Sequence, residues 1–168
     1  TSQTSEFTYN LHVDNTPPVL DEIVKISKEE GGIATELTKI VDKYHTNSKE
    51  LRVEGRYTET ANDNIPPSLS KPPVEILSYY QLSSTAAWTE ITAKSILNID
   101  NNKFELKLTL PFLNDYQQFS LKLVLKDKSG NPNSATNQQA HVKDIILDTQ
   151  PPQITITPHS TTSRTTHT

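Results

Sequence analysis

The stretch that decides the fold runs from Gln118 to Ile154 and reads QFSLKLVLKDKSGNPNSATNQQAHVKDIILDTQPPQI. Its first part alternates apolar and polar residues, which is typical of a half-buried strand. A polar, turn-rich loop follows, then a second apolar strand, and then two prolines. Proline has no N–H to donate, so strand pairing ends there. The pattern predicts a strand, a loop, a second strand and a stiff linker.

Apolar segments of the same kind recur along the rest of the chain. Together they predict seven strands, over residues 19–26, 50–58, 74–82, 86–97, 104–110, 119–126 and 140–147. Short strands separated by turns indicate an all-β protein in which two antiparallel sheets pack as a sandwich. Residues 33–44 differ, because their apolar positions recur every three or four residues. That spacing indicates one short helical insertion, with two short strands as the alternative.

Composition excludes several classes of function. The chain has 168 residues and a net charge of −4, which argues against nucleic acid and anionic membranes as partners. No apolar run approaches the roughly 20 residues of a membrane span, so membrane insertion is not expected. Cysteine is absent, so the chain has neither a disulfide nor a reactive thiol.

The proline linker occurs twice. It reads DNTPP at residues 14–18 and DTQPP at residues 148–152, with an offset of 148 − 14 = 134 residues. A repeat at one domain length indicates a module from a tandem array, with its domain over residues 14–148. Residues 1–13 are then either the last strand of a preceding module or an extra edge strand. Residues 149–168 are the linker, the start of a next module and a low-complexity tail.

Two groups of residues carry a resemblance to a known family. They are Asp127, Gly130 and Asn131 in the loop, and Asp148, Thr149 and Pro152 in the second linker. This turn, strand and linker pattern resembles the bacterial Ig-like repeats of large surface proteins and adhesins. The resemblance covers about the last third of the module and the first linker, whereas residues 27–97 match no repeat pattern.

The resemblance implies an Ig-like β-sandwich in an extracellular or cell-surface bacterial protein. The implied role is that of a stalk or spacer in an adhesin-type array, with neighbouring Ig-like modules of the same chain as partners. One alternative is a ligand-binding module that holds a glycan or a host surface receptor through insertions at 27–47 and 59–73, since loops on a rigid sandwich often carry function. A third possibility is an accessory domain of a secreted hydrolase.

Calcium is the one cofactor that the sequence suggests. In the sandwich order, Asp14, Asp63, Asp127 and Asn131 fall at one pole, and Ca²⁺ takes oxygen ligands from several loops. The resemblance also implies junctional Ca²⁺, which would stiffen an array. The alternative is that each of these residues serves its own turn, because Asp and Asn side chains bind the local backbone.

No catalytic motif is present, and we expect that the chain is not an enzyme. The sequence has no HExxH zinc motif and no Gly-X-Ser-X-Gly nucleophile elbow. The chain has four glycines in total, which are too few to favour a glycine-rich phosphate-binding loop.

Tyr79, Tyr80 and Trp88 are the ligand-binding candidates outside the linkers. Consecutive residues of a strand point to opposite faces, so one tyrosine is expected in the core and the other on the outside. Trp88 is expected to pack between the sheets. An exposed face that stacks on a sugar is the alternative.

Overall fold

The computed structural model describes residues 16–58, 75–100, 102–127 and 142–153, and these residues form strands and no helix. The strands are β1 (Val19–Glu30), β2 (Ile33–Glu36), β3 (Thr38–Ile40), β4 (Lys43–Thr46), β5 (Glu50–Thr58), β6 (Glu75–Gln81), β7 (Thr89–Glu90), β8 (Lys94–Asp100), β9 (Lys103–Thr109), β10 (Tyr116–Lys126) and β11 (Val142–Asp148). Within the described ranges, no helix has the length and apolarity to cross a membrane. The expected extra strand or module end at residues 1–13 lies outside these ranges.

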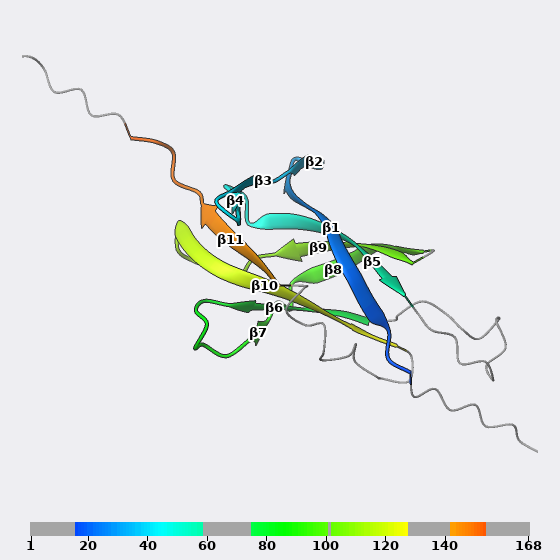
Figure 1. Ribbon diagram of the computed structural model, residues 1–168. Coiled ribbons are helices and arrows are strands. Elements are labelled where there is room, and N and C mark those ends of the chain that lie inside the picture. Colours follow the sequence, from blue (N-terminus) through cyan, green and yellow to red (C-terminus); the bar gives the residue numbers. More distant parts are fainter. Residues whose placement is uncertain (1–15, 59–74, 101, 128–141, 154–168) are drawn as a thin grey trace, which may run out of the picture.

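Two sheets pack face to face, which confirms the prediction of an all-β sandwich (Figure 1). The five-stranded sheet has the order β2-β1-β5-β9-β8, and the six-stranded sheet has the order β3-β4-β11-β10-β6-β7. The expectation of purely antiparallel sheets is wrong at one place, because β4 pairs with β11 in parallel. Chain direction at this pair depends on a contact between strands far apart in sequence, which alternation does not encode.

The core lies between the sheets and follows from the alternation of each strand. Apolar residues at every second position of β5 and β9 face those of β10 and β11. Their fully or almost fully buried members are Leu51, Val53, Tyr57, Phe104, Leu106, Leu108, Phe119, Leu121, Leu123, Leu125, Ile145 and Leu147. The intervening polar residues of these strands form the two outer faces of the sandwich.

The helix expected at residues 33–44 does not form, and the segment instead makes β2, β3 and β4. Gly31 and Gly32 adopt positive φ angles, so the chain reverses and β2 pairs with β1. Val41 and Asp42 also have positive φ and form the two-residue turn between β3 and β4. The helical spacing is therefore misleading, since these turns leave Ile33 and Val41 exposed at 71% and 88%.

The strand expected over residues 86–97 is divided into β7 and β8, which belong to different sheets. Ile91 lies between them, is buried in the core, and donates its N–H to the carbonyl of Ser78 at 2.8 Å. This residue fixes the crossover from one sheet to the other. A single apolar residue between two polar stretches gives no periodicity from which a crossover could be predicted.

The chain runs through the sandwich from one pole to the other (Figure 1). Val19, at the start of β1, lies opposite Thr58, and Lys126 at the end of β10 lies opposite Glu75. We call this end the β1 pole. Asp148, at the end of β11, lies opposite Tyr116 at the other end of β10, which we call the β11 pole.

Candidate functional site

Of the four residues predicted to bind calcium, the structure describes Asp127. It follows the end of β10 at the β1 pole and is 6% exposed. Asp14, Asp63 and Asn131 lie outside the described residues. In the part of the chain that the structure describes, no three acidic or histidine side chains gather as a metal-binding group. The calcium site therefore stays a prediction.

The two neighbouring tyrosines point to opposite sides of β6, as alternation predicts. Tyr80 lies across from the buried Leu121 and packs edge-on against Phe112, with ring centroids 5.0 Å apart. Tyr79 lies across from Lys122 on the outer face of the six-stranded sheet. Tyr80 therefore packs against the core, and Tyr79 is the tyrosine that faces outward.

Trp88 does not pack between the sheets, so that expectation is wrong. The residue is half-buried, and Lys122 Nζ lies 4.4 Å from the centroid of its ring. The same Nζ lies 5.4 Å from the ring centroid of Tyr79. Burial lowers the pKa of Lys122 below its ordinary value of 10.5. We call Tyr79, Trp88 and Lys122 the aromatic–lysine cluster.

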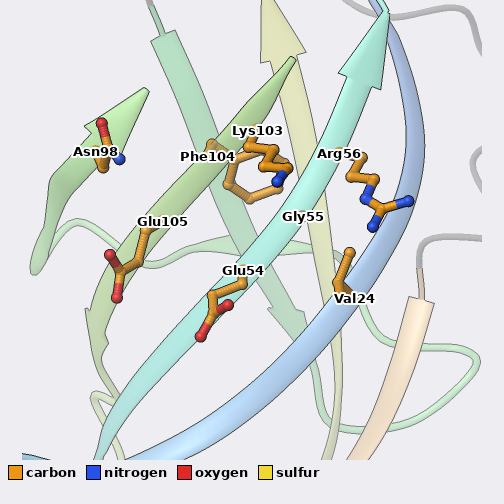
Figure 2. A pocket seen from close by; sticks show the side chains of 8 residues that line it. All are labelled: Val24, Glu54, Gly55, Arg56, Asn98, Lys103, Phe104 and Glu105. Carbon is orange, nitrogen blue, oxygen red and sulfur yellow. The ribbon is translucent and has the colours of Figure 1, made fainter. Parts of the chain in front are cut away.

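A second feature is a hollow of about 290 Å³ on the outer face of the five-stranded sheet (Figure 2). Its lining residues come from β1, β5, β8 and β9, and they are Val24, Glu54, Gly55, Arg56, Asn98, Lys103, Phe104 and Glu105. The lining contains two carboxylates and two cationic side chains, so their formal charges cancel. The hollow therefore has no net charge with which to attract an ion.

Gly55 shapes the floor of this hollow. A Cβ at this position would clash with Cζ of Phe104 and would lie 2.9 Å from the carbonyl oxygen of Glu22. The Phe104 ring thus occupies the space that a side chain at position 55 would need. Only glycine lets β1, β5 and β9 approach this closely.

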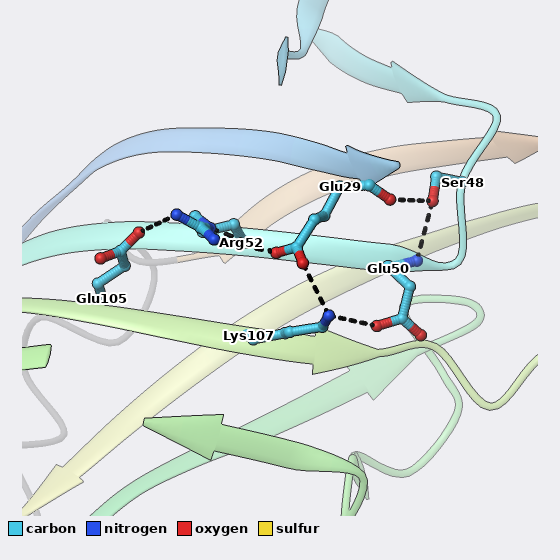
Figure 3. Close-up of polar contacts among 6 residues, drawn as sticks. All are labelled: Glu29, Ser48, Glu50, Arg52, Glu105 and Lys107. Atoms are coloured by element: carbon cyan, nitrogen blue, oxygen red, sulfur yellow. Dashed lines mark hydrogen bonds and ion pairs between the residues drawn. The ribbon is translucent and has the colours of Figure 1, made fainter. Parts of the chain in front are cut away.

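An ion network covers the same outer face, and we call its members the charge network (Figure 3). They are Glu29, Glu50, Arg52, Glu105 and Lys107. Arg52 joins Glu105 at 2.8 Å and Glu29 at 3.2 Å, and Lys107 joins Glu29 at 2.8 Å and Glu50 at 3.4 Å. Glu29 is the shared centre, with a side chain only 11% exposed.

The charge network shifts the pKa values of Glu29, Arg52 and Lys107 in the direction of their charged forms. The hydrogen bond from Lys107 lowers the pKa of Glu29 below 4.5, with Arg52 adding to it and burial opposing it. The hydrogen bond to Glu29 raises the pKa of Lys107 above 10.5. Burial would lower the pKa of Arg52, but Glu29 and Glu105 outweigh it and raise that pKa. The charged groups of the network pair with one another, which is typical of residues that stabilise a fold.

The chain is anchored where it leaves the sandwich at the β11 pole. Thr149 donates its N–H to the carbonyl of Asp115 at 2.8 Å, and its hydroxyl lies 3.1 Å from Oδ1 of Asp115. Asp148 Oδ1 accepts a hydrogen bond from the N–H of Gln150 at 3.1 Å. Pro151 and Pro152 follow directly. The linker therefore leaves in a direction fixed by the loop between β9 and β10.

Comparison with protein-family models, with curated proteins and with solved structures gives no match.

Lys122 and the charge network are the functional features that the sequence did not reveal. Alternation in β10 predicts that Lys122 faces outward. Its contact with Trp88 depends on how the segment after β6 folds back, and no periodicity encodes that. Glu29 meets Lys107 only because β1 and β9 flank β5 in the same sheet.

Proposed function

We propose that the chain is an Ig-like structural module of a bacterial extracellular or cell-surface protein, linked in series with similar modules as a stalk or spacer. Strand order supports the Ig-like assignment. The order β1-β5-β9-β8 corresponds to strands A, B, E and D of an Ig domain, and β11-β10-β6 corresponds to G, F and C. The turn and linker motifs that resemble bacterial Ig-like repeats support the same assignment.

The observation that carries the proposal is the anchored linker at the pole opposite the start of β1. A module that receives the chain at one end and releases it at the other extends an array by its own length. The eleven residues of β10 correspond to roughly 37 Å at about 3.4 Å per residue. The hydrogen bonds of Thr149 to Asp115 and the two prolines after it give the released chain a fixed direction.

The loop that anchors Thr149 also offers a contact surface to whatever follows. Leu113 and Tyr116 flank Asp115 and are 95% and 58% exposed. Exposed apolar side chains beside a directed linker suit a short contact with the next module. A junction of this kind restrains bending without a large interface.

Strand geometry also suits a load-bearing role. β1 lies in one sheet and β11 in the other, and each has its free end at its own pole. Tension applied through both ends acts along these strands. The ladder hydrogen bonds of β1 with β5, and of β11 with β10 and β4, are then loaded together rather than opened one after another.

A tandem protein tests the proposal. We would join Leu20 of a second copy to Gln153 of the first, because residue 154 matches residue 20 at the same offset of 134. Small-angle X-ray scattering should give a second maximum in the pair-distance distribution at roughly 40 Å, the length of one module. Replacing Pro151 and Pro152 by glycine should broaden or remove this maximum. A tandem that scatters identically with prolines and with glycines would contradict the proposal.

A further inference from the structure

Lys122 occupies an unusual position on the outer face of the six-stranded sheet. It lies in β10, which is flanked by β11 and β6, and its neighbours across the ladder are Val142 and Tyr79. Trp88 reaches the ammonium group from the segment just before β7. Residues from three parts of the chain thus converge on one cation.

The ammonium group of Lys122 has two aromatic rings as neighbours. Among the described residues, no carboxylate lies within ion-pair distance of Lys122 Nζ. Lys126 on the same face of the same strand does have one, since it pairs with Glu75 at 3.5 Å. The difference is local to the aromatic–lysine cluster and is not a property of the whole face.

Aromatic faces attract a cation but do not use its hydrogen-bond donors. An ammonium group carries three N–H donors. A ring face attracts its positive charge but offers no lone pairs to accept hydrogen bonds from these donors. A charged acceptor beside Nζ would form charge-assisted hydrogen bonds, which are the stronger kind. The cluster therefore has the chemistry to receive an anionic oxygen group.

The surroundings restrict which anion fits. Glu90 lies opposite Tyr79 in β7, and Asp144 lies opposite Ser120 in β11, so both carboxylates share the outer face with Lys122. Asp144 already accepts a hydrogen bond from the hydroxyl of Ser120. Glu90 pairs with Nζ of Lys94 at 2.8 Å, so a ligand with several negative charges would meet repulsion chiefly from Asp144. A ligand with one carboxylate and several hydroxyl donors would not.

We propose that the aromatic–lysine cluster is a binding site for a carboxylate-bearing sugar. The sugar carboxylate accepts hydrogen bonds from Lys122 Nζ. Its ring packs on the exposed part of Trp88 or Tyr79, and its hydroxyls donate to Asp144 and Glu90. Tyr79 and Trp88 are half-buried, so part of each ring remains accessible. This site does not depend on the arrangement of modules in series, and its failure would leave the proposed function intact.

The single tryptophan of the chain makes the test direct, because the one indole N–H signal in an NMR spectrum comes from Trp88. The probes are sialyllactose and galacturonate, which carry one carboxylate each, and each is compared with an uncharged counterpart, lactose and the methyl ester of galacturonate. Each acidic probe should shift the indole signal and bind at least about tenfold more tightly than its counterpart, a difference of about 1.4 kcal/mol. Poly-L-glutamate serves as the acidic polypeptide probe.

Three variants assign the effect to the cluster. Lys122→Gln should remove the preference for the acidic probes, and Lys122→Arg should retain it because the positive charge remains. Lys126→Gln is the matched control on the same face of β10 and should retain the preference. The proposal is overturned if neither acidic sugar shifts the indole signal, or if the preference survives in Lys122→Gln. It is also overturned if poly-L-glutamate binds as tightly as the acidic sugars.

Discussion

On the outer face of the five-stranded sheet, Arg52 and Lys107 lie between carboxylates, whereas on the outer face of the six-stranded sheet Lys122 lies between two aromatic rings. The charge network uses its donors and acceptors within the protein. In the aromatic–lysine cluster, the cation lies against two rings, and no described residue accepts a hydrogen bond from it. The first face is therefore suited to stability, and the second retains a capacity for binding.

The difference begins in strand order. β5 has β1 on one side and β9 on the other, so Arg52 meets acidic residues from both neighbours. β10 has Val142 of β11 and Tyr79 of β6 opposite Lys122. A cationic residue that faces outward from an inner strand thus has different neighbours according to which strands flank it.

The largest expected effect comes from separating the strands that carry the charge network. Gly55→Ala places a Cβ against both the Phe104 ring and the backbone of Glu22, so the strands must move apart. We expect a loss of about 3 kcal/mol in the free energy of unfolding, at the upper end of overpacking effects. Urea denaturation measures it, and Asn98→Ala at the rim of the same hollow is the control. A stable Gly55→Ala variant would mean that the strands tolerate a wider spacing.

The next effect comes from removing the centre of the charge network. Glu29→Gln leaves Arg52 and Lys107 with fewer charged partners, so the urea midpoint should fall at neutral pH. The pKa of Glu29 is lowered in the folded state, so the charged carboxylate stabilises the fold. This stabilisation is complete above pH 4.5 and is lost as the pH falls through the pKa of the folded state. The gap between the wild type and Glu29→Gln should therefore close in acid.

The raised pKa of Lys107 sets an upper pH limit on the stability that the charge network provides. The stabilisation from the charge of Lys107 is complete below pH 10.5 and is lost as the pH rises through the pKa of the folded state. Glu30→Gln is the control for Glu29→Gln, because Glu30 pairs with Lys28 near the edge and its side chain is 54% exposed. A gap between the wild type and Glu29→Gln that stays constant from neutral pH to acid would show that Glu29 acts through packing and not through charge.

A smaller effect is expected on the other face. Trp88→Ala removes one of the two rings beside Lys122, and a cation–π contact contributes about 0.5–2 kcal/mol. In contrast to Glu29→Gln, this loss should not change between neutral and acidic pH, because neither an indole nor a lysine titrates there. Urea denaturation at both pH values measures it, with Trp88→Phe expected to keep part of the stability. A strong acid dependence would indicate a carboxylate partner for Lys122.

The smallest effect is expected at Ser27, which is fully buried in β1 across from Arg52. Its hydroxyl is the one buried side-chain polar atom in the described ranges without a hydrogen-bond partner. Ser27→Ala removes an unsatisfied group, so stability should stay within about 0.5 kcal/mol of the wild type or rise. Thermal unfolding checks this. A loss well above that range would mean that the hydroxyl has a partner, such as a bound water.

Much of the sandwich could be predicted from the sequence because alternation is local. It located β1, β5, β6, β9, β10 and β11 to within a few residues, except that β1 continues to Glu30. It failed at residues 33–44, where positive φ angles at Gly31, Gly32, Val41 and Asp42 make turns that apolar spacing does not reveal. The aromatic–lysine cluster could not be predicted in this way, because Trp88 and Lys122 come together only where the loop after β6 folds back over β10.

The central claim is that the module carries load in series through its two poles, and single-molecule pulling tests it most directly. Force applied through Thr16 and Gln153 loads β1 and β11 along their lengths, so we predict unfolding in one step at a high force. Force applied through Asn102 and Thr58, both at the β1 pole, should peel strands apart at a much lower force. Equal unfolding forces in the two directions would contradict the claim.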